Sequence, residues 1–515
     1  MHEKNKSRKE FHMKRIFTIA LALVMLVSVL GLYACANNDD KNDTTTPDAT
    51  VDPTGSKYNE KLNDLDFGGT EVRFVFAEGA NDHFTQRSIK VEEEGGNDVN
   101  KQLMARNAYV ENAINVKISS TQVGSGFGDL NGEISNSLAA GADAYDVLVG
   151  YQYYDIGWPV LNGYLVNLNR PETYDIVDYF NFDNDYWGKY YNENLLAGNG
   201  RYWVTGDIAL RYIGGMYVTY VNERIYSNTL KEKYGDIYDI AFDGKWTLDM
   251  LTEMAELCYV DNGNDEVDKE DQLGFIWESN NDSTDGLAFG SQVPYSTKYA
   301  DGSIKITLNS DRTIEFVNKL DKLFNNGKFS YCETAGDDSR VRMELFATGT
   351  VAFVLGQIKH AENWLGNMVD KYYVLPAPKL NEQQADYVTG VHDGCSIFGI
   401  AKDSSHIQAA AATLEIMAAK SHELVTPVYY ESAVKFQYTR DSAAARVIEE
   451  LVHKHVETDF AGVWSNQLGD VVHFFRNNNT TKGLTSTLKR SMTSYQTQLD
   501  TLLAKFAQLQ EDEGY

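Results

Sequence analysis

The stretch AGADAYDVLVG (140–150) decides the fold, because it ends in a short apolar run that is typical of a strand buried inside a parallel sheet. Upstream, EVRFVF (71–76) alternates as a strand does, and VKI (116–118) begins another strand. Apolar residues at helical spacing fill the two intervals, over 97–114 and 132–140. This order of strand, helix, strand, helix and strand predicts an α/β layer whose sheet is mostly parallel.

The α/β alternation continues towards the C-terminus. Thr247 has the side chain of an N-cap and Asp249 places a negative charge in the first turn, so we expect a helix over 247–258. Apolar periodicity predicts further helices over 310–325, 406–419, 442–455 and 486–510.

Composition limits the classes of protein to which the chain can belong. Hydrophobic residues make up 43% of its 515 residues, which is too many for a disordered or collagen-like chain. The length predicts two or three domain-sized units. The 74 acidic residues outnumber the 46 basic ones and give a net charge of −28. Such a surface repels phosphate backbones, so we expect no nucleic-acid partner.

The start of the chain resembles a bacterial lipoprotein signal. Two basic residues precede an uncharged run over 16–33, and Cys35 follows LYA (32–34) as the acylated cysteine follows a lipobox. We therefore expect a signal peptide over 1–34 and a flexible linker over 35–64. The mature protein would be exported and held on the outer face of the cell membrane by a lipid such as palmitate on Cys35. The alternative is a transmembrane anchor, because the 18 residues of the apolar run almost span a bilayer.

Several segments stand in an order that is typical of one protein family: NAYVENAINVKI (107–118), GDIALRYIGGMYVTYVN (206–222), GKWTLD (244–249), FATGTVAFV (346–354) and VLPAPK (374–379). Together with the stretch at 140–150, they resemble the extracellular solute-binding proteins that feed ABC importers, in the family that includes maltose-binding protein. The resemblance extends from about 67 to 509.

The resemblance implies a type II periplasmic-binding-protein fold, in which two α/β lobes enclose a ligand cleft and are joined by crossing hinge strands. By the same likeness, the first crossover lies near 205–218 and the second near 388–396. The family also implies a monomer. The implied boundaries are 65–205 with about 393–430 for lobe 1, and 206–392 with about 431–515 for lobe 2.

Tyr151, Gln152 and Tyr153 follow the strand at 146–150, and open α/β sheets bind ligands beyond the carboxyl ends of their strands. A sugar presents hydroxyl edges and apolar C–H faces, which amides or carboxylates and aromatic rings match. We therefore expect these side chains to contact a carbohydrate ligand. The alternative is that the tyrosines cap the core or contact the other lobe.

Asp207, Arg211 and Tyr212 lie on or beside the first crossover, which borders the cleft in this family. Asp207 either accepts hydrogen bonds from ligand hydroxyls or caps the following turn. Arg211 either grips a ligand carboxylate, which would favour an organic acid or a peptide, or pairs with one of the surplus acids.

Two further pairs are candidates for ligand contacts. Gln357 and His360 follow the apolar strand at 351–355, where the family often places such side chains. His392 and Asp393 lie in the second crossover. Adjacent residues of a strand point to opposite faces, so we expect at most one of these two to face the ligand.

An acidic loop, DNGNDEVDKED (261–271), resembles a calcium loop of the family. Asn262, Asn264, Asp268 and Asp271 offer oxygen ligands, but the usual first Asp and the central Gly are missing. A solvated acidic loop is therefore the alternative to a structural calcium. We expect no other cofactor, since the spacing of the cysteines matches no zinc motif.

The sequence contains no nucleophile elbow, zinc-peptidase helix or phosphate-binding loop, so we expect a binding protein rather than an enzyme. The function that follows is a lipid-anchored receptor that captures a carbohydrate, most simply an oligosaccharide, by hinge closure and delivers it to an ABC permease. One alternative is a surface glycan-binding, adhesion or signalling receptor with the same fold. Another is a secreted glycosidase, whose paired carboxylates a sequence does not reveal.

Overall fold

A computed structural model describes residues 58–79, 83–91, 97–126, 128–188, 200–278, 282–333, 339–435 and 442–514. These residues belong to one compact unit, 54–515. The predicted signal peptide and Cys35 lie outside the described residues. Within the described ranges, no helix combines the length and the apolar character that crossing a membrane requires.

Lobe 1 is built on a four-stranded sheet of order β11-β3-β1-β2. β1 (Thr70–Ala77) pairs in parallel with β2 (Val116–Gly124) and with β3 (Val147–Tyr151), and β11 (Ser396–Ile400) pairs antiparallel with β3. Every residue of β3 is buried, as expected for a strand of a covered sheet. The predicted α/β class is confirmed, and β11 adds an antiparallel edge from a distant part of the chain.

Helices pack on the sheet of lobe 1. The predicted helix over 97–114 is α3 (Asp98–Ile114), which begins where the Asn97 side chain accepts a hydrogen bond from the Asn100 backbone N–H. It ends at Asn115, which adopts the left-handed conformation common at helix C-termini. The other helices of this lobe are η1 (Glu60–Asp64), α2 (Phe84–Ile89), α4 (Asp129–Ala140), α5 (Gln152–Asp155), α6 (Gly157–Leu161) and η2 (Pro171–Tyr174).

Lobe 2 contains a five-stranded sheet of order β10-β4-β9-β5-β8. β9 pairs in parallel with β5, which pairs in parallel with β8, whereas β4 runs antiparallel to both of its neighbours. A two-stranded ribbon, β6 with β7, stands apart from this sheet. The strands are β4 (Tyr217–Asn222), β5 (Leu273–Glu278), β6 (Ser296–Lys298), β7 (Ile304–Ile306), β8 (Ser330–Glu333), β9 (Val351–Gln357) and β10 (Tyr372–Pro376).

The helix predicted after Thr247 is α11 (Leu248–Cys258), and the Thr247 side chain accepts a hydrogen bond from the Met250 backbone N–H as an N-cap does. Its buried residues, among them Leu251 and Met254, lie on one face. The other helices of lobe 2 are α8 (Glu223–Thr229), α9 (Lys231–Tyr234), α10 (Ile237–Phe242), α12 (Asp282–Gly290), α13 (Asp311–Phe324), α14 (Ser339–Ala347) and α15 (Lys359–Trp364).

The two crossovers between the lobes run side by side. Val204 bridges Phe398, and Met216 bridges Val391, both antiparallel. The first crossover also contains a short helix, α7 (Leu210–Gly214). Within the first crossover, before α7, Gly206 has φ +147°, and a Cβ added there would collide with the Tyr186 carbonyl oxygen. Only glycine fits this approach of two backbones.

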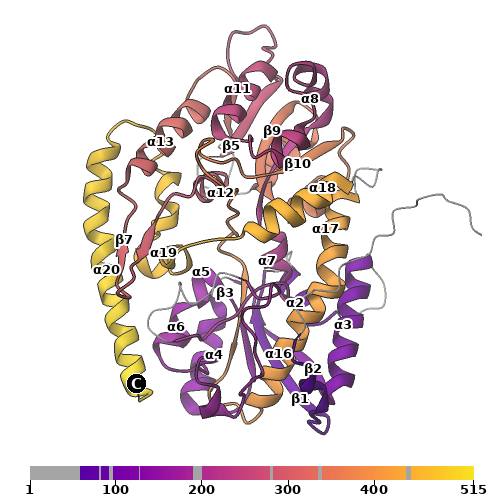
Figure 1. The fold of residues 1–515 in the computed structure, drawn as a ribbon, viewed down its shortest axis with the longest axis vertical. Coiled ribbons are helices and arrows are strands. Elements are labelled where there is room, and N and C mark those ends of the chain that lie inside the picture. The colour runs from indigo at the N-terminus through magenta and orange to yellow at the C-terminus, as the bar shows by residue number, and fades with distance from the viewer. Residues whose placement is uncertain are drawn as a thin grey trace, which may run out of the picture. The chain divides into compact units, whose positions relative to one another are not determined.

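Beyond β11, most of the residues that the structure describes are helical. The helix predicted over 442–455 starts as an α-helix but continues as a π-helix and a 3₁₀ turn, which places His453 against the first crossover. Figure 1 shows the last helix, α20, in yellow beside β7 and α6, which belong to different lobes, and α20 contacts both. The elements are α16 (Ile407–Lys420), η5 (Ser421–Val425), α17 (Thr426–Lys435), α18 (Ser442–Arg446), η6 (Val447–Val452), η7 (His453–His455), α19 (Phe460–Val463), η8 (Asn466–Leu468), η9 (Val471–Arg476) and α20 (Leu484–Asp512).

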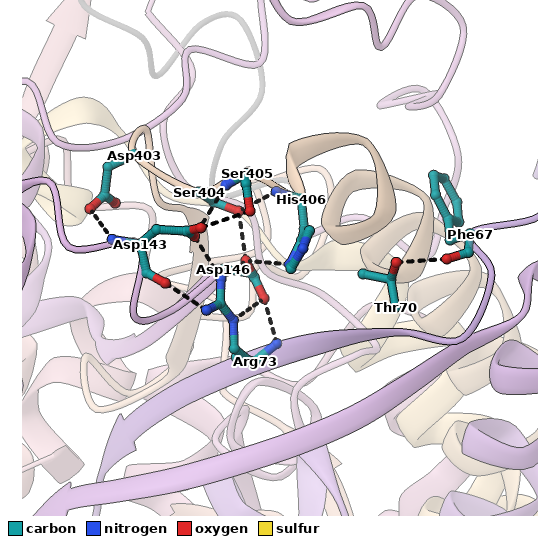
Figure 2. Close-up of polar contacts among 9 residues, drawn as sticks. All are labelled: Phe67, Thr70, Arg73, Asp143, Asp146, Asp403, Ser404, Ser405 and His406. Carbon is teal, nitrogen blue, oxygen red and sulfur yellow. Dashed lines mark hydrogen bonds and ion pairs between the residues drawn. The ribbon is translucent and has the colours of Figure 1, made fainter.

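A polar cluster fixes the amino end of β3 (Figure 2). The Arg73 guanidinium on β1 donates to both carboxylate oxygens of Asp146, at 2.9 and 2.7 Å, and Ser404 donates to Asp146 at 2.6 Å. Asp143 accepts from Arg73 and from Ser405, each at 2.7 Å. Burial opposes ionisation of Asp143, but the bonds from Ser405 and Arg73 prevail and lower its pKa to about 2. The cluster ties β1 and β3 to the loop before α16.

Candidate functional site

A small cavity lies where strand ends of both sheets meet the second crossover. Its volume is about 10 Å³, which is room for about one water molecule. Ligands of α/β sheets bind beyond strand ends, so this cavity is the candidate site. Its lining combines Gln152 of lobe 1, Tyr217, Asp285 and Phe289 of lobe 2, Val391 and Asp393 of the second crossover, and Gly462 and Val472 of the C-terminal region.

Asp393 and His473 form the first charged pair at the cavity. His473 Nε2 lies 2.8 Å from Asp393 Oδ2. Burial opposes ionisation of Asp393, but the hydrogen bond from His473 and the charges of neighbouring basic groups lower its pKa. Burial also opposes the charged form of His473, but its hydrogen bond to Asp393 prevails and raises the pKa of the imidazole. Each partner therefore favours the charged form of the other.

Asp285 and Arg476 form the second pair. Asp285 lies on α12 with 3% of its side chain exposed, and the Arg476 guanidinium donates to both of its carboxylate oxygens, with Nε at 3.3 and 3.0 Å. Burial raises the pKa of Asp285 despite the neighbouring Arg476. His473 Nε2 is 3.9 Å from Asp285 Oδ2, so the two pairs form one network. This network links lobe 2 to the second crossover through η9.

The three candidates after β3 take different positions. Gln152 is 2% exposed, lines the cavity and donates to the Val463 carbonyl at 3.4 Å. The Tyr153 ring stacks on His473, with centroids 5.2 Å apart, and its hydroxyl donates to Asp470. Tyr151 is 1% exposed and lies under Arg211. Gln152 therefore lines the cavity and Tyr153 packs on His473 beside it, whereas Tyr151 lies under Arg211 within lobe 1.

Arg211 is buried, with 4% of its side chain exposed. Its guanidinium carbon lies 4.6 Å from the centre of the Tyr151 ring, and Nη2 donates to the Tyr151 hydroxyl at 3.1 Å. Nη1 donates to the Gly394 carbonyl at 3.4 Å, and Nε is 3.7 Å from Glu78 Oε1. Arg211 thus joins the ends of β1 and β3 to the second crossover, which matches the alternative of pairing with an acid of the chain.

Asp207 lies on the first crossover and is buried. Its Oδ2 is 2.6 Å from His422 Nδ1 and accepts from Thr426 at 3.1 Å, while Oδ1 is 2.9 Å from His453 Nε2. Burial opposes ionisation, but the charges and hydrogen bonds of His453 and His422 lower the pKa of Asp207. Asp207 therefore anchors the first crossover to η5 and η7, and it does not line the cavity.

Three other candidates are also buried away from the cavity lining. Tyr212 is 3% exposed. Gln357 ends β9, and its backbone N–H donates to His360 Nδ1 at 3.1 Å. The imidazole of His360 packs against Trp364, with ring centroids 4.5 Å apart. Their contact with a ligand stays a prediction.

The second crossover is not a continuous strand, since the chain turns at 393–394 before β11 begins at Ser396. Strand alternation therefore does not separate His392 from Asp393. The two side chains lie on the same side, with His392 Nδ1 3.5 Å from Asp393 Oδ1. Of the two, only Asp393 is among the residues that line the cavity.

The acidic loop at 261–271 is held by its own hydrogen bonds. Asn264 Nδ2 donates to Asp268 at 2.8 Å, and Asp271 accepts from the Asn262 backbone N–H at 2.9 Å. Across the described ranges, no group of three or more His, Cys, Asp or Glu side chains is arranged to hold a metal ion. Calcium binding at Asn262, Asn264, Asp268 and Asp271 stays an untested expectation.

Sequence reasoning missed Asp285, His473 and Arg476. Asp285 lies in the first turn of α12 in lobe 2, while His473 and Arg476 belong to η9, far along the chain, and no spacing connects them. Tyr217 falls within the predicted first crossover, so its position was a usable signal.

A larger cavity of about 330 Å³ lies beside the second crossover, between 386–388 and 454–458. The two segments are joined where the Thr389 backbone N–H donates to the His455 carbonyl at 2.9 Å. No strand end contributes to the lining of this cavity, so its position does not match that of a ligand site in an α/β sheet.

No protein-family model matches the sequence. No curated protein sequence matches it either. Solved structures do match. An ABC substrate-binding protein from Listeria monocytogenes, in complex with cycloalternan, is 14% identical with a TM-score of 0.50, over 84% of this chain and 99% of that one. UgpB from Mycobacterium tuberculosis, in complex with glycerophosphocholine, is 15% identical with a TM-score of 0.51, over 85% and 100%. This chain has the two-lobe α/β fold of the ABC substrate-binding proteins.

Proposed function

We propose that this chain is an extracellular solute-binding receptor that captures a carbohydrate, most simply an oligosaccharide, and delivers it to an ABC permease. One observation carries the proposal. The carboxylates of Asp285 and Asp393, the amide of Gln152 and the rings of Tyr217 and Phe289 surround one cavity between the sheets. Carboxylates and amides bond sugar hydroxyls, and rings cover the apolar faces of sugars.

The charges at the cavity favour an uncharged ligand. Asp285 is paired with Arg476, and Asp393 is paired with His473. A charged ligand would have to compete with these pairs, which costs most at Asp285, whose side chain is 3% exposed. Arg211, the residue that would have favoured an organic acid, is engaged by Glu78.

The mechanism is closure of the two lobes around the ligand. A cavity of about 10 Å³ does not admit a sugar ring, so the lobes must separate for binding. On closure, α2 of lobe 1 meets α15 of lobe 2, where Arg87 Nη1 lies 3.2 Å from Glu362 Oε1. A ligand that contacts both lobes favours the closed population by its differential affinity for it.

The test is calorimetric titration of the purified chain with a panel of oligosaccharides, followed by chromatography of the mixture. We expect saturable binding of one class of sugar and no product. Absence of binding across the panel would contradict a carbohydrate ligand. Appearance of shorter sugars would contradict the receptor and favour the glycosidase.

A pair of variants locates the binding site. Phe289→Leu removes a ring at the cavity while keeping an apolar side chain, and we expect about a tenfold loss of affinity. Phe316→Leu is the matched control, because Phe316 is also buried but packs on Phe475 of the C-terminal region. Equal affinities of the two variants would place the sugar elsewhere.

The proposal includes a lipid anchor at Cys35. Its support is the sequence around LYA (32–34), which resembles a lipobox. We expect cells fed a labelled palmitate to transfer the label to the wild-type chain and not to Cys35→Ser. Labelling of both chains, or of neither, would contradict the anchor.

A further inference from the structure

The helix α20 contacts both lobes. It packs on β7 of lobe 2 and on α6 of lobe 1, and Figure 1 shows it running alongside both. Gln496 and Glu513, which mark its two attachments, are separated by about 26 Å along a helix. Any separation of the lobes must therefore break one of these attachments or bend the helix.

The attachment to lobe 2 is extensive. The Asp459 carboxylate accepts hydrogen bonds from the Tyr295 backbone N–H at 2.8 Å and from the Ser296 backbone N–H and hydroxyl, each at 2.9 Å. Further along, Gln496 on α20 accepts from the Ile306 backbone N–H at 3.0 Å. With the Asp285–Arg476 pair, these contacts attach the region from Asp459 through α20 to lobe 2. Tyr153 of lobe 1 also contacts this region, at Asp470 and His473.

The hydrogen bonds that attach α20 itself to lobe 1 converge on Glu513, at the end of the helix. Glu513 Oε2 accepts from Asn167 Nδ2 at 3.1 Å and from the Tyr202 hydroxyl at 3.2 Å. The Glu513 main-chain oxygen also accepts from the Arg170 guanidinium. Four residues earlier, Leu509 lies against Gly163, where an added Cβ would be 3.4 Å from Leu509 Cδ1. Glu513 is half-buried, so this attachment lies near solvent, where water can replace its bonds.

We propose that the end of α20 is a releasable clasp, which holds lobe 1 against lobe 2 through Glu513 and opens when the lobes separate. The proposal rests on the proposed function in one respect, namely that hinge opening admits the ligand. The clasp is inferred from the difference in extent between the two attachments of α20. The many contacts with lobe 2 keep α20 on that lobe, while the few contacts at Glu513 are the ones that break.

The experiment measures lobe separation directly and without ligand. Fluorophores are attached through non-canonical residues placed at Val177 of lobe 1 and Val369 of lobe 2, which are 48% and 96% exposed. Single-molecule energy transfer then gives the populations with short and long separations. Glu513→Ala removes the side-chain bonds to Asn167 and Tyr202, and we expect the ratio of long to short separations to rise about two- to tenfold.

The matched control is Glu511→Ala, which removes the same charge from an exposed position on α20. We expect this variant to match the wild type. Tyr202→Phe removes only the hydrogen bond from the Tyr202 hydroxyl to Glu513, so we expect part of the shift in populations. Because Glu513→Ala already removes this bond, the double variant should have the same populations as Glu513→Ala alone. Equal populations in the wild type, Glu513→Ala and Tyr202→Phe would overturn the clasp.

Failure of the clasp and failure of the proposed function are separable. A chain that binds no oligosaccharide in calorimetry, but whose lobes separate more often in Glu513→Ala, would contradict the receptor and support the clasp. A chain that binds sugar with unchanged lobe populations in Glu513→Ala would support the receptor and overturn the clasp.

Discussion

Each of the two crossovers between the lobes contains an aspartate that is bonded to histidine, but the two aspartates differ in their exposure. Asp207 on the first crossover has 1% of its side chain exposed and is bonded to His422 and His453. Asp393 on the second crossover has 20% exposed, is bonded to His473 and faces the cavity. The contact between aspartate and histidine is thus buried at the first crossover and borders a cavity at the second.

Under the proposed function, this difference separates a residue that anchors a crossover from one that contacts the ligand. Both carboxylate oxygens of Asp207 are bonded to side chains of the C-terminal helical region, and these bonds fix the first crossover in place. Asp393 is fixed by His473 and also lines the candidate cavity. We therefore expect loss of Asp207 to act on stability, and loss of Asp393 to act on binding.

The largest expected effect is that of Asp207→Asn on stability. The substitution leaves two histidines facing a neutral amide in a buried site, and breaking a buried pair costs about 3–5 kcal/mol. Urea unfolding followed by tryptophan fluorescence measures the change. Asp393→Asn is the matched comparison, and we expect it to cost under about 2 kcal/mol because its site is partly hydrated. Equal losses would remove the distinction between the two crossovers.

The next effect is that of Asp393→Asn on ligand affinity. A hydrogen bond to a charged group contributes about 1.5–3 kcal/mol, so we expect affinity for the sugar found by calorimetry to fall about ten- to hundredfold. Asp239→Asn, an exposed position on α10, controls for the change in charge. If affinity survives in Asp393→Asn, the ligand does not bond this carboxylate.

Local sequence patterns were sufficient for most of the fold. The alternation in 71–76, the apolar run before Gly150 and the cap at Thr247 each determine an element through residues only a few positions apart. The antiparallel edge strand β11 was not predicted, because its partner β3 is hundreds of residues earlier and a strand's own sequence does not name its neighbour.

The site was predicted only where it coincides with strand ends and crossovers. Gln152 and Asp393, which line the candidate cavity, were named for this reason. Asp285, His473 and Arg476 meet through packing of η9 on α12, which no spacing in the sequence reveals. The pairing of Asp207 with two histidines has the same origin, since His422 and His453 come from different turns of the C-terminal helices.

The third effect is a dependence of stability on pH at the first crossover. His473 at the second crossover, whose pKa is also raised, adds a contribution of the same sign. The bond to Asp207 raises the pKa of His422, while Asp185 and Glu449 add to the negative field around it. A raised pKa means that this contribution is fully present below about pH 6.5 and is lost as the pH rises through the folded-state pKa. The contribution of Asp207, whose pKa is lowered, is lost only in acid.

We therefore expect the free energy of unfolding to fall by about 1–2 kcal/mol from pH 6 to pH 9, and this part of the slope to be absent in His422→Gln. Unfolding in urea across that range measures it. His406→Gln is the control, because it also replaces a histidine near an aspartate, but in the cluster at the amino end of β3 and not at the first crossover. The same slope in wild type and His422→Gln would show that His422 is not the responsible group.

The smallest effect tests closure without touching either crossover. Arg87 on α2 and Glu362 on α15 meet across the lobes with side chains 16% and 27% exposed, and ion pairs near solvent contribute about 0.2–1 kcal/mol. Glu362→Gln should lower ligand affinity by about fivefold or less, and the difference should shrink in high salt. Because neither Asp207 nor Asp393 changes, its urea midpoint should match the wild type. A larger loss of affinity would mean that lobe contacts, rather than the carboxylate of Asp393, supply most of the binding energy.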